Sequence, residues 1–125
     1  MRIVQEKDLR YSYTLRNLWG RECGCIDANH HDNYITLDRF CVACKYRGSR
    51  HRYGKQLLDA IIKEAKSDGV LYILATPKAE EVYDNVEQME LPDLYRKYLN
   101  LGFEFKDSGE LKAYGNVMRL FIKYD

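Results

Sequence analysis

The stretch that decides the fold is residues 40–58, FCVACKYRGSRHRYGKQLL. Its first four residues are apolar and belong to a run of β-formers, Tyr34–Cys44, which predicts a strand. Lys45–Tyr53 is basic and contains a glycine, so it predicts a loop. From Gly54 to Asp68 apolar residues recur at helical spacing, and Gly69 supplies a C-terminal stop. The stretch therefore predicts a strand, a basic loop and a helix N-terminus, in that order.

This order suits the binding of an anion, because the backbone N–H groups and the dipole at a helix N-terminus favour negative charge. No acidic residue lies between Asp38 and Asp59, whereas the basic residues there are Arg39, Lys45, Arg47, Arg50, Arg52 and Lys55. The balance reverses between Glu80 and Asp93, where no Lys or Arg occurs. The two segments indicate an anionic ligand with a cationic one nearby, and two solvated loops of opposite sign are the alternative.

Upstream of residue 34 the sequence predicts little sheet. Arg2–Val4 is a short strand. Asp8 caps a predicted helix that ends near Gly20 and places four side chains on one face: Tyr11, Leu15, Leu18 and Trp19. Glu22–Asn33 is loop-like.

Downstream, helices and strands alternate. Val70–Ala75 is a continuous apolar run, which predicts a buried strand parallel to Tyr34–Cys44. Leu91–Leu101 is a second helix with proline in its first turn. Phe103–Lys106 and Val117–Tyr124 are two further strands, joined through turn residues at 107–109 and 114–116. The fold class is therefore α/β with a mixed sheet.

Composition limits the function classes. The chain has 125 residues, 46% of them hydrophobic, with two prolines, which predicts one globular domain over 1–125 and argues against disorder. A formal net charge of +1 makes nucleic acid an improbable partner for the whole surface. No apolar run has membrane-spanning length and Met1–Val4 lacks a signal-peptide core, so we expect a cytoplasmic protein without a membrane partner.

Three pieces of the opening stretch, FCVA (40–43), YRG (46–48) and YGKQLL (53–58), together resemble the acetyl-CoA motif of the GNAT superfamily. In that motif a strand runs into an R/Q-x-x-G-x-G/A loop and then a helix. LYRKYLNLGFE (94–104) resembles the second GNAT signature, an aromatic residue four positions before Gly-Phe, and VMRLFIK (117–123) resembles the last strand. The resemblance covers Tyr34–Tyr124, beside an N-terminal part that reads as compressed and lacking a full hairpin.

The resemblance implies a central sheet with splayed strands and flanking helices, with acetyl-CoA (CoA) as the acyl donor. It places the pantetheine arm along the strand at Cys41 and Val42. The diphosphate would lie at the loop and helix start, whose residues are Arg47, Gly48, Arg50, His51, Arg52, Tyr53, Gly54 and Lys55. The acceptor would be an amine on a small molecule or a protein.

The implied mechanism is direct attack of the amine on the thioester. Tyr98 stands at the position of the proton donor, with Tyr95 as its rival, and a tyrosine that only packs against the sheet is the alternative. Asp38 is the best carboxylate for the base, with Glu22 behind it, and a water chain would also serve.

Two departures from the motif affect the function. Counting back from Gly54, Arg52 occupies the place of the first motif glycine. If Arg47 is the motif arginine, the loop is about two residues longer than usual. The alternative function is therefore a catalytically silent protein of the same fold that binds nucleic acid or a protein partner; a dimer is left open.

The four cysteines allow a zinc site by spacing. Cys23 and Cys25, followed by Cys41 and Cys44, form C-x-C and C-x-x-C pairs, a pattern that four-thiolate zinc sites use. However, residues three apart on a strand face opposite sides, so Cys41 and Cys44 would diverge. Buried free thiols and no metal are the prediction.

Overall fold

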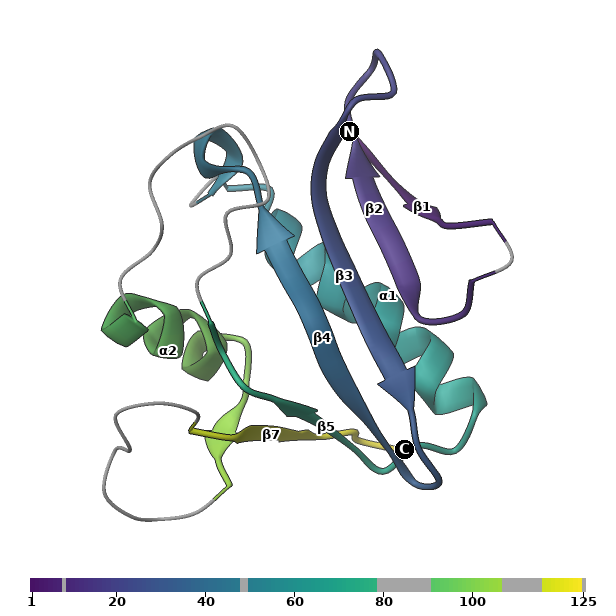
Figure 1. The fold of residues 1–125 in the computed structure, drawn as a ribbon, viewed down its shortest axis with the longest axis vertical. Coiled ribbons are helices and arrows are strands. Elements are labelled where there is room, and N and C mark those ends of the chain that lie inside the picture. Colours follow the sequence, from purple (N-terminus) through teal and green to yellow (C-terminus); the bar gives the residue numbers. More distant parts are fainter. Residues whose placement is uncertain (8, 48–49, 79–90, 107–115, 125) are drawn as a thin grey trace.

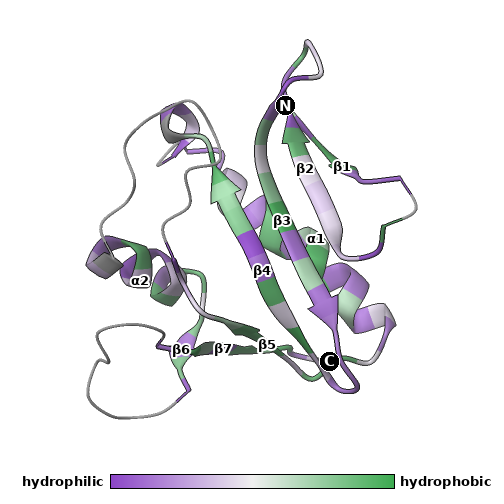
Figure 2. Cartoon of the chain, in the orientation of Figure 1, coloured by the Kyte–Doolittle hydropathy of each residue, from purple (hydrophilic) through white to green (hydrophobic). Residues whose placement is uncertain are grey.

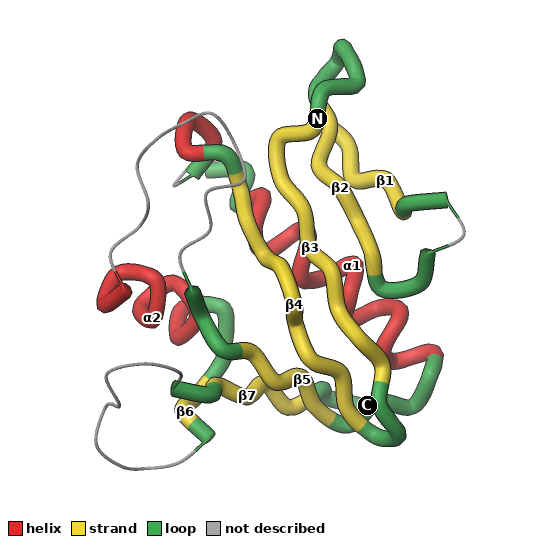
Figure 3. The backbone as a smooth tube through the Cα atoms, viewed as in Figure 1, coloured by secondary structure: helices red, strands yellow, loops and turns green. Residues whose placement is uncertain are grey.

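The computed structural model describes residues 1–7, 9–47, 50–78, 91–106 and 116–124 (Figure 1). Within these ranges the elements are β1 (Arg2–Gln5), β2 (Ser12–Arg16), β3 (Glu22–His30), β4 (Tyr34–Val42), the 3-10 turn η1 (Cys44–Tyr46), α1 (Tyr53–Ser67), β5 (Tyr72–Ala75), α2 (Leu91–Asn100), β6 (Glu104–Phe105) and β7 (Met118–Phe121). Figure 3 shows the strands with α1 running behind them.

The strands form one mixed sheet in the order β1-β2-β3-β4-β5-β7-β6. Strands β1 to β4 are an antiparallel meander, and β5, β7 and β6 are also antiparallel to one another. Among the strand pairs of the described residues, only β4 and β5 are parallel, and α1 is the crossover between them. The predicted α/β class, the mixed sheet and the parallel pairing of these two strands are confirmed.

α1 packs against β2, β3 and β4, and both helices contribute to one hydrophobic core. α1 buries Leu57, Leu58, Ile61 and Ala65, the apolar stripe that its helical spacing predicts. Phe40 of β4 lies next to Gly54 of α1: a Cβ added to Gly54 would be in van der Waals contact with the Phe40 ring, at 3.8 Å. The same ring packs edge-on against Tyr98 of α2, with centroids 5.8 Å apart. β4 therefore joins the two helices into one core.

The C-terminal part of α1 is hydrogen-bonded to β2 and to the segment before it. Glu64 accepts hydrogen bonds from the amide of Tyr11 at 2.7 Å and from the Tyr13 hydroxyl at 3.1 Å. Asp68 accepts from the Arg10 guanidinium and from the Tyr11 hydroxyl. Burial and the bond to Glu64 raise the pKa of Tyr13 to about 12. The bonds from Arg10 and Tyr11 lower the pKa of Asp68.

The helix predicted from Asp8 to Gly20 is wrong, because Ser12–Arg16 is strand β2. Tyr11 and Leu15 are four residues apart, which fits a helix, but four is also twice the strand period, so both share a face in either structure. The segment forms a strand and not a helix because it pairs with β1 on one side and with β3 on the other. Leu18 and Trp19, which the helix would have placed on its buried face, lie in the turn before β3.

The loop predicted over Glu22–Asn33 is also wrong, because Glu22–His30 is strand β3. Its C-terminal part is polar (Figure 2) and Gly24 interrupts its first half, so composition indicated a loop. The glycine is needed for close packing: a Cβ there would come 3.0 Å from the carbonyl oxygen of Cys41 and 3.4 Å from a methyl of Leu57. The hairpin that the sequence did not reveal is therefore present, in β2 and β3.

The remaining elements agree with the sequence to within a few residues. The helices predicted at Gly54–Asp68 and Leu91–Leu101 are α1 and α2, and the last two strands are β6 and β7. The strand predicted to Cys44 ends at Val42, where the chain turns into η1. The predicted turn at 107–109 and most of that at 114–116 lie outside the described residues. Neither α-helix within those residues is long and apolar enough to cross a membrane.

Candidate active site

β4 is paired with β5 along only its first half. The Cα partners run from Tyr34 with Tyr72 to Leu37 with Ala75, where β5 ends. β4 continues to Val42, paired on its other side with β3. The two parallel strands thus separate after Leu37, which is the splayed arrangement predicted for this fold class.

A bulge accompanies this separation. Asp27 of β3 pairs with Arg39 and Ala28 pairs with Leu37, so Asp38 is an extra residue on β4. A bulge bends its strand and increases the local twist, which turns the second half of β4 away from β5. The bulge also places the Asp38 carboxylate at the point where the strands part.

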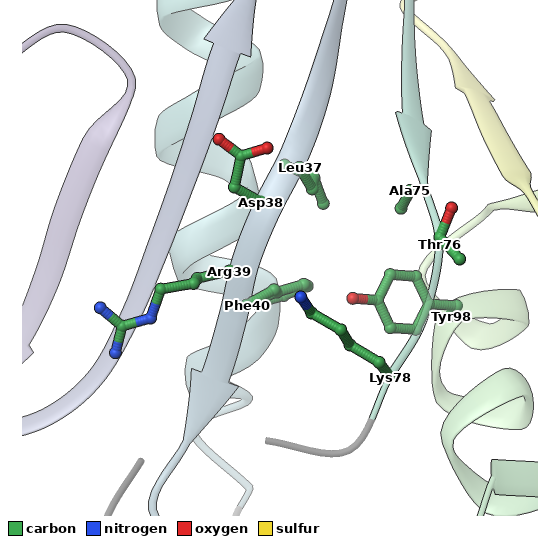
Figure 4. Close-up of a pocket in the computed structure, with 8 residues that line it drawn as sticks. All are labelled: Leu37, Asp38, Arg39, Phe40, Ala75, Thr76, Lys78 and Tyr98. Carbon is green, nitrogen blue, oxygen red and sulfur yellow. The ribbon is translucent and has the colours of Figure 1, made fainter. Parts of the chain in front are cut away.

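A pocket lies between the separated strands (Figure 4). Its lining residues come from β4, from the segment that leaves β5 and from α2: Leu37, Asp38, Arg39, Phe40, Ala75, Thr76, Lys78 and Tyr98. Tyr98 and Asp38, the two residues predicted to be catalytic, therefore line one pocket.

Tyr98 reaches the pocket from α2. Its ring is buried between Phe40 and Phe103, with centroid distances of 5.8 and 5.2 Å. Figure 4 shows its hydroxyl directed into the space between the strands. Tyr95, the rival, packs its ring on Phe105 at 5.4 Å and does not line the pocket. Its buried hydroxyl has no hydrogen-bond partner among the described residues. The two tyrosines therefore occupy different surroundings, and only Tyr98 meets the pocket.

Asp38 is exposed, and its carboxylate accepts a hydrogen bond from the Asn29 side chain of β3. In Figure 4 the carboxylate points away from the tyrosine hydroxyl. Glu22, the second predicted base, begins β3 opposite Arg16 and is not among the lining residues. The carboxylate at the pocket is therefore that of Asp38.

Beyond the pocket, the N-terminus of α1 has no side-chain cap. Its N-cap residue, Arg52, has φ 51° and ψ 57°, and its side chain makes no capping hydrogen bond. The first turn of the helix contains no acidic residue. Arg52 stands where the motif has glycine, and it keeps the left-handed backbone for which glycine is the usual choice. The helix end can therefore offer its first N–H groups to an anion.

The predicted phosphate-side cations differ in their surroundings. Arg47 is folded back, and its Nε donates to the Val42 carbonyl at 2.8 Å. Lys55 pairs with Asp59 along α1 at 2.9 Å. Arg50 and Arg52 are exposed, and the exposed His51 stacks on Tyr53 with ring centroids 5.3 Å apart. Gly48, with Ser49 beside it, lies outside the described residues.

The end of β4 meets the start of α1 at Val42 and Gly54. A Cβ on Gly54 would lie 3.8 to 4.0 Å from Phe40 and 4.0 Å from Val42, an ordinary contact. Cys41 is buried and is the cross-strand partner of Cys25. The predicted pantetheine-side residues therefore lie on the part of β4 that has left β5.

Cys23, Cys25 and Cys41 are buried, and none of these three forms a disulfide. In the parts of the chain that the structure describes, no three His, Cys, Asp or Glu side chains are grouped as metal ligands. The absence of metal stays a prediction, which metal analysis can test.

Sequence reasoning missed the side of the pocket that follows β5, namely Thr76 and Lys78. In Figure 4 the Lys78 side chain extends across the pocket toward Phe40. Their position in the sequence could have indicated this. Both residues closely follow the strand predicted to lie beside β4, and residues at the carboxyl ends of parallel strands commonly line a site.

The mixed sheet of the described residues, with its two parallel strands that separate at a bulge, can be compared with known proteins. No protein-family model matches the sequence, and no curated protein matches it. Solved structures do match in fold. A GNAT-family acetyltransferase of Staphylococcus aureus superposes with a TM-score of 0.69 at 21% identity, over 90% of this chain and 67% of that one.

Two further structures extend the likeness. The ribosomal-protein-S18-alanine N-acetyltransferase of Escherichia coli matches with a TM-score of 0.62 at 18% identity, over 91% of this chain and 70% of its own. Tetrahymena GCN5 matches with a TM-score of 0.64 at 16% identity, over 92% and 71%. At these identities the likeness is one of fold. The resemblance that the sequence motifs suggested is confirmed at that level.

Proposed function

We propose that the protein is an N-acyltransferase that moves an acetyl group from acetyl-CoA to an amine by direct attack. The proposal is carried by a pocket where β4 leaves β5, by a buried tyrosine directed into it, and by an α1 N-terminus without a side-chain cap, where Gly54 lies near Phe40 of the pocket lining. The solved structures that share this fold include acetyltransferases, which supports the same reaction class.

The residues present fit an acyl-CoA. The second half of β4 has an edge that β5 does not cover, and such an edge can exchange backbone hydrogen bonds with an extended amide-containing arm. Cys41 and Val42 are the residues of that edge nearest to α1. The first-turn amides of α1, at Tyr53, Gly54 and Lys55, would receive the diphosphate.

Cationic side chains would add charge around the diphosphate. Arg50 and Arg52 are exposed at the helix start and can turn toward an anion. Arg47 holds the end of β4 through the Val42 carbonyl, so its role is to position the loop. Gly48 and His51 complete the loop in this proposal.

Acetyl-CoA supplies a thioester carbon that an amine can attack. Tyr98 donates its hydroxyl proton to the departing sulfur, and its burial among Phe40 and Phe103 keeps the hydroxyl in one direction. Asp38 accepts the proton that the attacking amine releases, directly or through water. Asn29 orients that carboxylate.

The alternative function, that of a catalytically silent binding protein, has less support. Binding alone requires no hydroxyl in a pocket at the point where the strands part, and no observation at the site favours nucleic acid.

The test is calorimetric titration of the folded protein with acetyl-CoA and with CoA. Gly54→Leu should weaken binding at least about tenfold, since a branched side chain would obstruct the backbone at the helix start. Gly54→Ala is the matched control, because its methyl finds ordinary contacts and the helix gains from alanine. Unchanged CoA affinity in a folded Gly54→Leu protein would exclude binding at this helix, and no binding by the wild type would exclude the transferase.

A further inference from the structure

The turn between β2 and β3 displays two large apolar side chains to solvent. Leu18 is 89% exposed and Trp19 is 87% exposed, whereas the next most exposed large apolar side chain among the described residues is Leu9 at 56%. Trp19 is the only tryptophan of the chain. We call residues 17–21 the β2–β3 tip; it projects beyond the body of the sheet (Figure 1).

The tip is held in shape by its own hydrogen bonds. The side-chain oxygen of Asn17 accepts from the amides of Trp19 at 2.9 Å and Arg21 at 3.0 Å. The Asn17 amide donates to the Arg21 carbonyl at 3.0 Å, and the Gly20 amide donates to the Asn17 carbonyl at 2.9 Å. Little ordering entropy is therefore lost when the apolar pair meets a binding surface.

Arginines surround the base of the tip. Arg16 reaches up to it, donating to the Gly20 carbonyl at 2.8 Å, and also contacts Glu6 at 3.3 Å. Arg2 is the cross-strand partner of Arg16 and is exposed, as is Arg21. Guanidinium groups bind phosphate with several N–H donors at once. The apolar apex thus has cationic groups directly behind it.

We propose that the β2–β3 tip anchors the protein to an anionic bilayer surface, with Leu18 and Trp19 entering the headgroup region and the arginines contacting lipid phosphates. Tryptophan favours that region, and arginine can keep its charge at the phosphates while its stem is covered. The expected absence of a membrane partner rested on the lack of a spanning segment, and a surface contact by a turn needs none.

A lipid surface suits this shape better than a protein does. A stable protein interface covers roughly 800 Å² on each partner. The tip instead offers two apolar side chains on a convex apex between polar neighbours, and only a deep matching pocket in another protein would enclose them. Fluid lipid closes around such an apex without a matching shape.

The sole tryptophan reports the contact directly. Vesicles of phosphatidylglycerol and phosphatidylcholine should shift the Trp19 emission to shorter wavelength, and lipids brominated in the acyl chains should quench it. Pure phosphatidylcholine vesicles should do so much less, and added salt should weaken the effect. Leu18→Ser, which keeps the probe, should weaken vesicle binding about tenfold. The double variant Arg2→Gln, Arg21→Gln should lose the preference for anionic vesicles.

The matched control is Leu99→Ser, a change of another exposed leucine on α2, which should leave vesicle binding unaltered. An unchanged emission spectrum with anionic vesicles would overturn the proposal, and so would a shift that Leu18→Ser leaves intact. A shift that grows with protein concentration without vesicles would assign the tip to a contact between copies instead. CoA titration is independent of every one of these outcomes.

Discussion

The two halves of β4 do different work in the same strand. Tyr34–Leu37 is paired on both sides, and the ring of Tyr34 stacks on that of Tyr72 with centroids 5.3 Å apart. Asp38–Val42 is paired with β3 but has no ladder to β5, and its β5 side opens into the pocket of Tyr98. The first half closes the sheet, and the second leaves room for a ligand.

The difference arises from two local features. The extra residue at Asp38 bends β4, and β5 stops at Ala75, two residues before Pro77. Proline has no backbone N–H, so it cannot continue a ladder of paired strands. A site is therefore made here by ending the pairing of two strands within one small sheet.

The largest effect should come from the closed half. Ile73 is fully buried opposite Ile35, so Ile73→Ala should lower the free energy of unfolding by about 2–5 kcal/mol. Urea unfolding measures this loss. Val42→Ala on the half-buried open half should cost less. Equal costs would mean that the two halves contribute alike to stability.

On the open half the expected loss is one of rate. Tyr98→Phe removes the proposed proton donor and keeps the ring packing, so kcat should fall by about 10²-fold or more. Affinity for CoA should change little. Steady-state kinetics with an amine acceptor, together with calorimetry, separate the two quantities.

Tyr95→Phe is the control for this prediction, because that hydroxyl lies outside the pocket and has no partner among the described residues. Its kcat should stay near that of the wild type. Equal losses in the two variants would indicate packing rather than proton transfer. In the same assay, Asp38→Asn should reduce kcat if this carboxylate takes the proton of the amine.

The two halves also differ in how far the sequence revealed them. Val70–Ala75 is a short continuous apolar run, and the apolar residues of α1 recur at helical spacing. Each pattern indicates one type of element, so the parallel strand pair and its helical crossover could be predicted. The spacing of Tyr11 and Leu15 fits both a helix and a strand, and β3 is polar in its second half. Pairing with neighbouring strands therefore determines that these segments are strands, and the sequence alone does not reveal it. The bulge at Asp38 could not be predicted, because it is a register shift between two strands. Motif spacing nevertheless singled out Tyr98, and its place on the predicted strand singled out Asp38; both side chains line the pocket.

A smaller effect is expected at the C-terminal end of α1, where Asp68 accepts hydrogen bonds from Arg10 and Tyr11. Those hydrogen bonds hold the pKa of Asp68 below its usual 3.8. A carboxyl whose pKa is depressed on folding adds stability above its unfolded pKa and loses it as pH falls through the folded value. Asp68→Asn should therefore lower Tm slightly at pH 7, and the difference should shrink as the pH falls below 3.8. A Tm difference that persists in acid would contradict this account.

The smallest expected effect is that of a chelator. β4 passes Cys41 before it ends at Val42, and Cys41 is packed beside Cys25 as a buried thiol. A zinc site of the C-x-x-C kind needs both sulfurs on one ion, whereas Cys41 lies within β4 and is buried there. Purified protein should therefore contain no stoichiometric metal, and EDTA should leave Tm unchanged. Cys41→Ser should still lower Tm, since it places a hydroxyl where a small apolar group packs. One zinc per chain, lost together with folding on chelation, would mean that the open half of β4 ends before Cys41. The edge proposed for the pantetheine arm would then not exist, and the contrast between the two halves would have to be explained by metal binding instead.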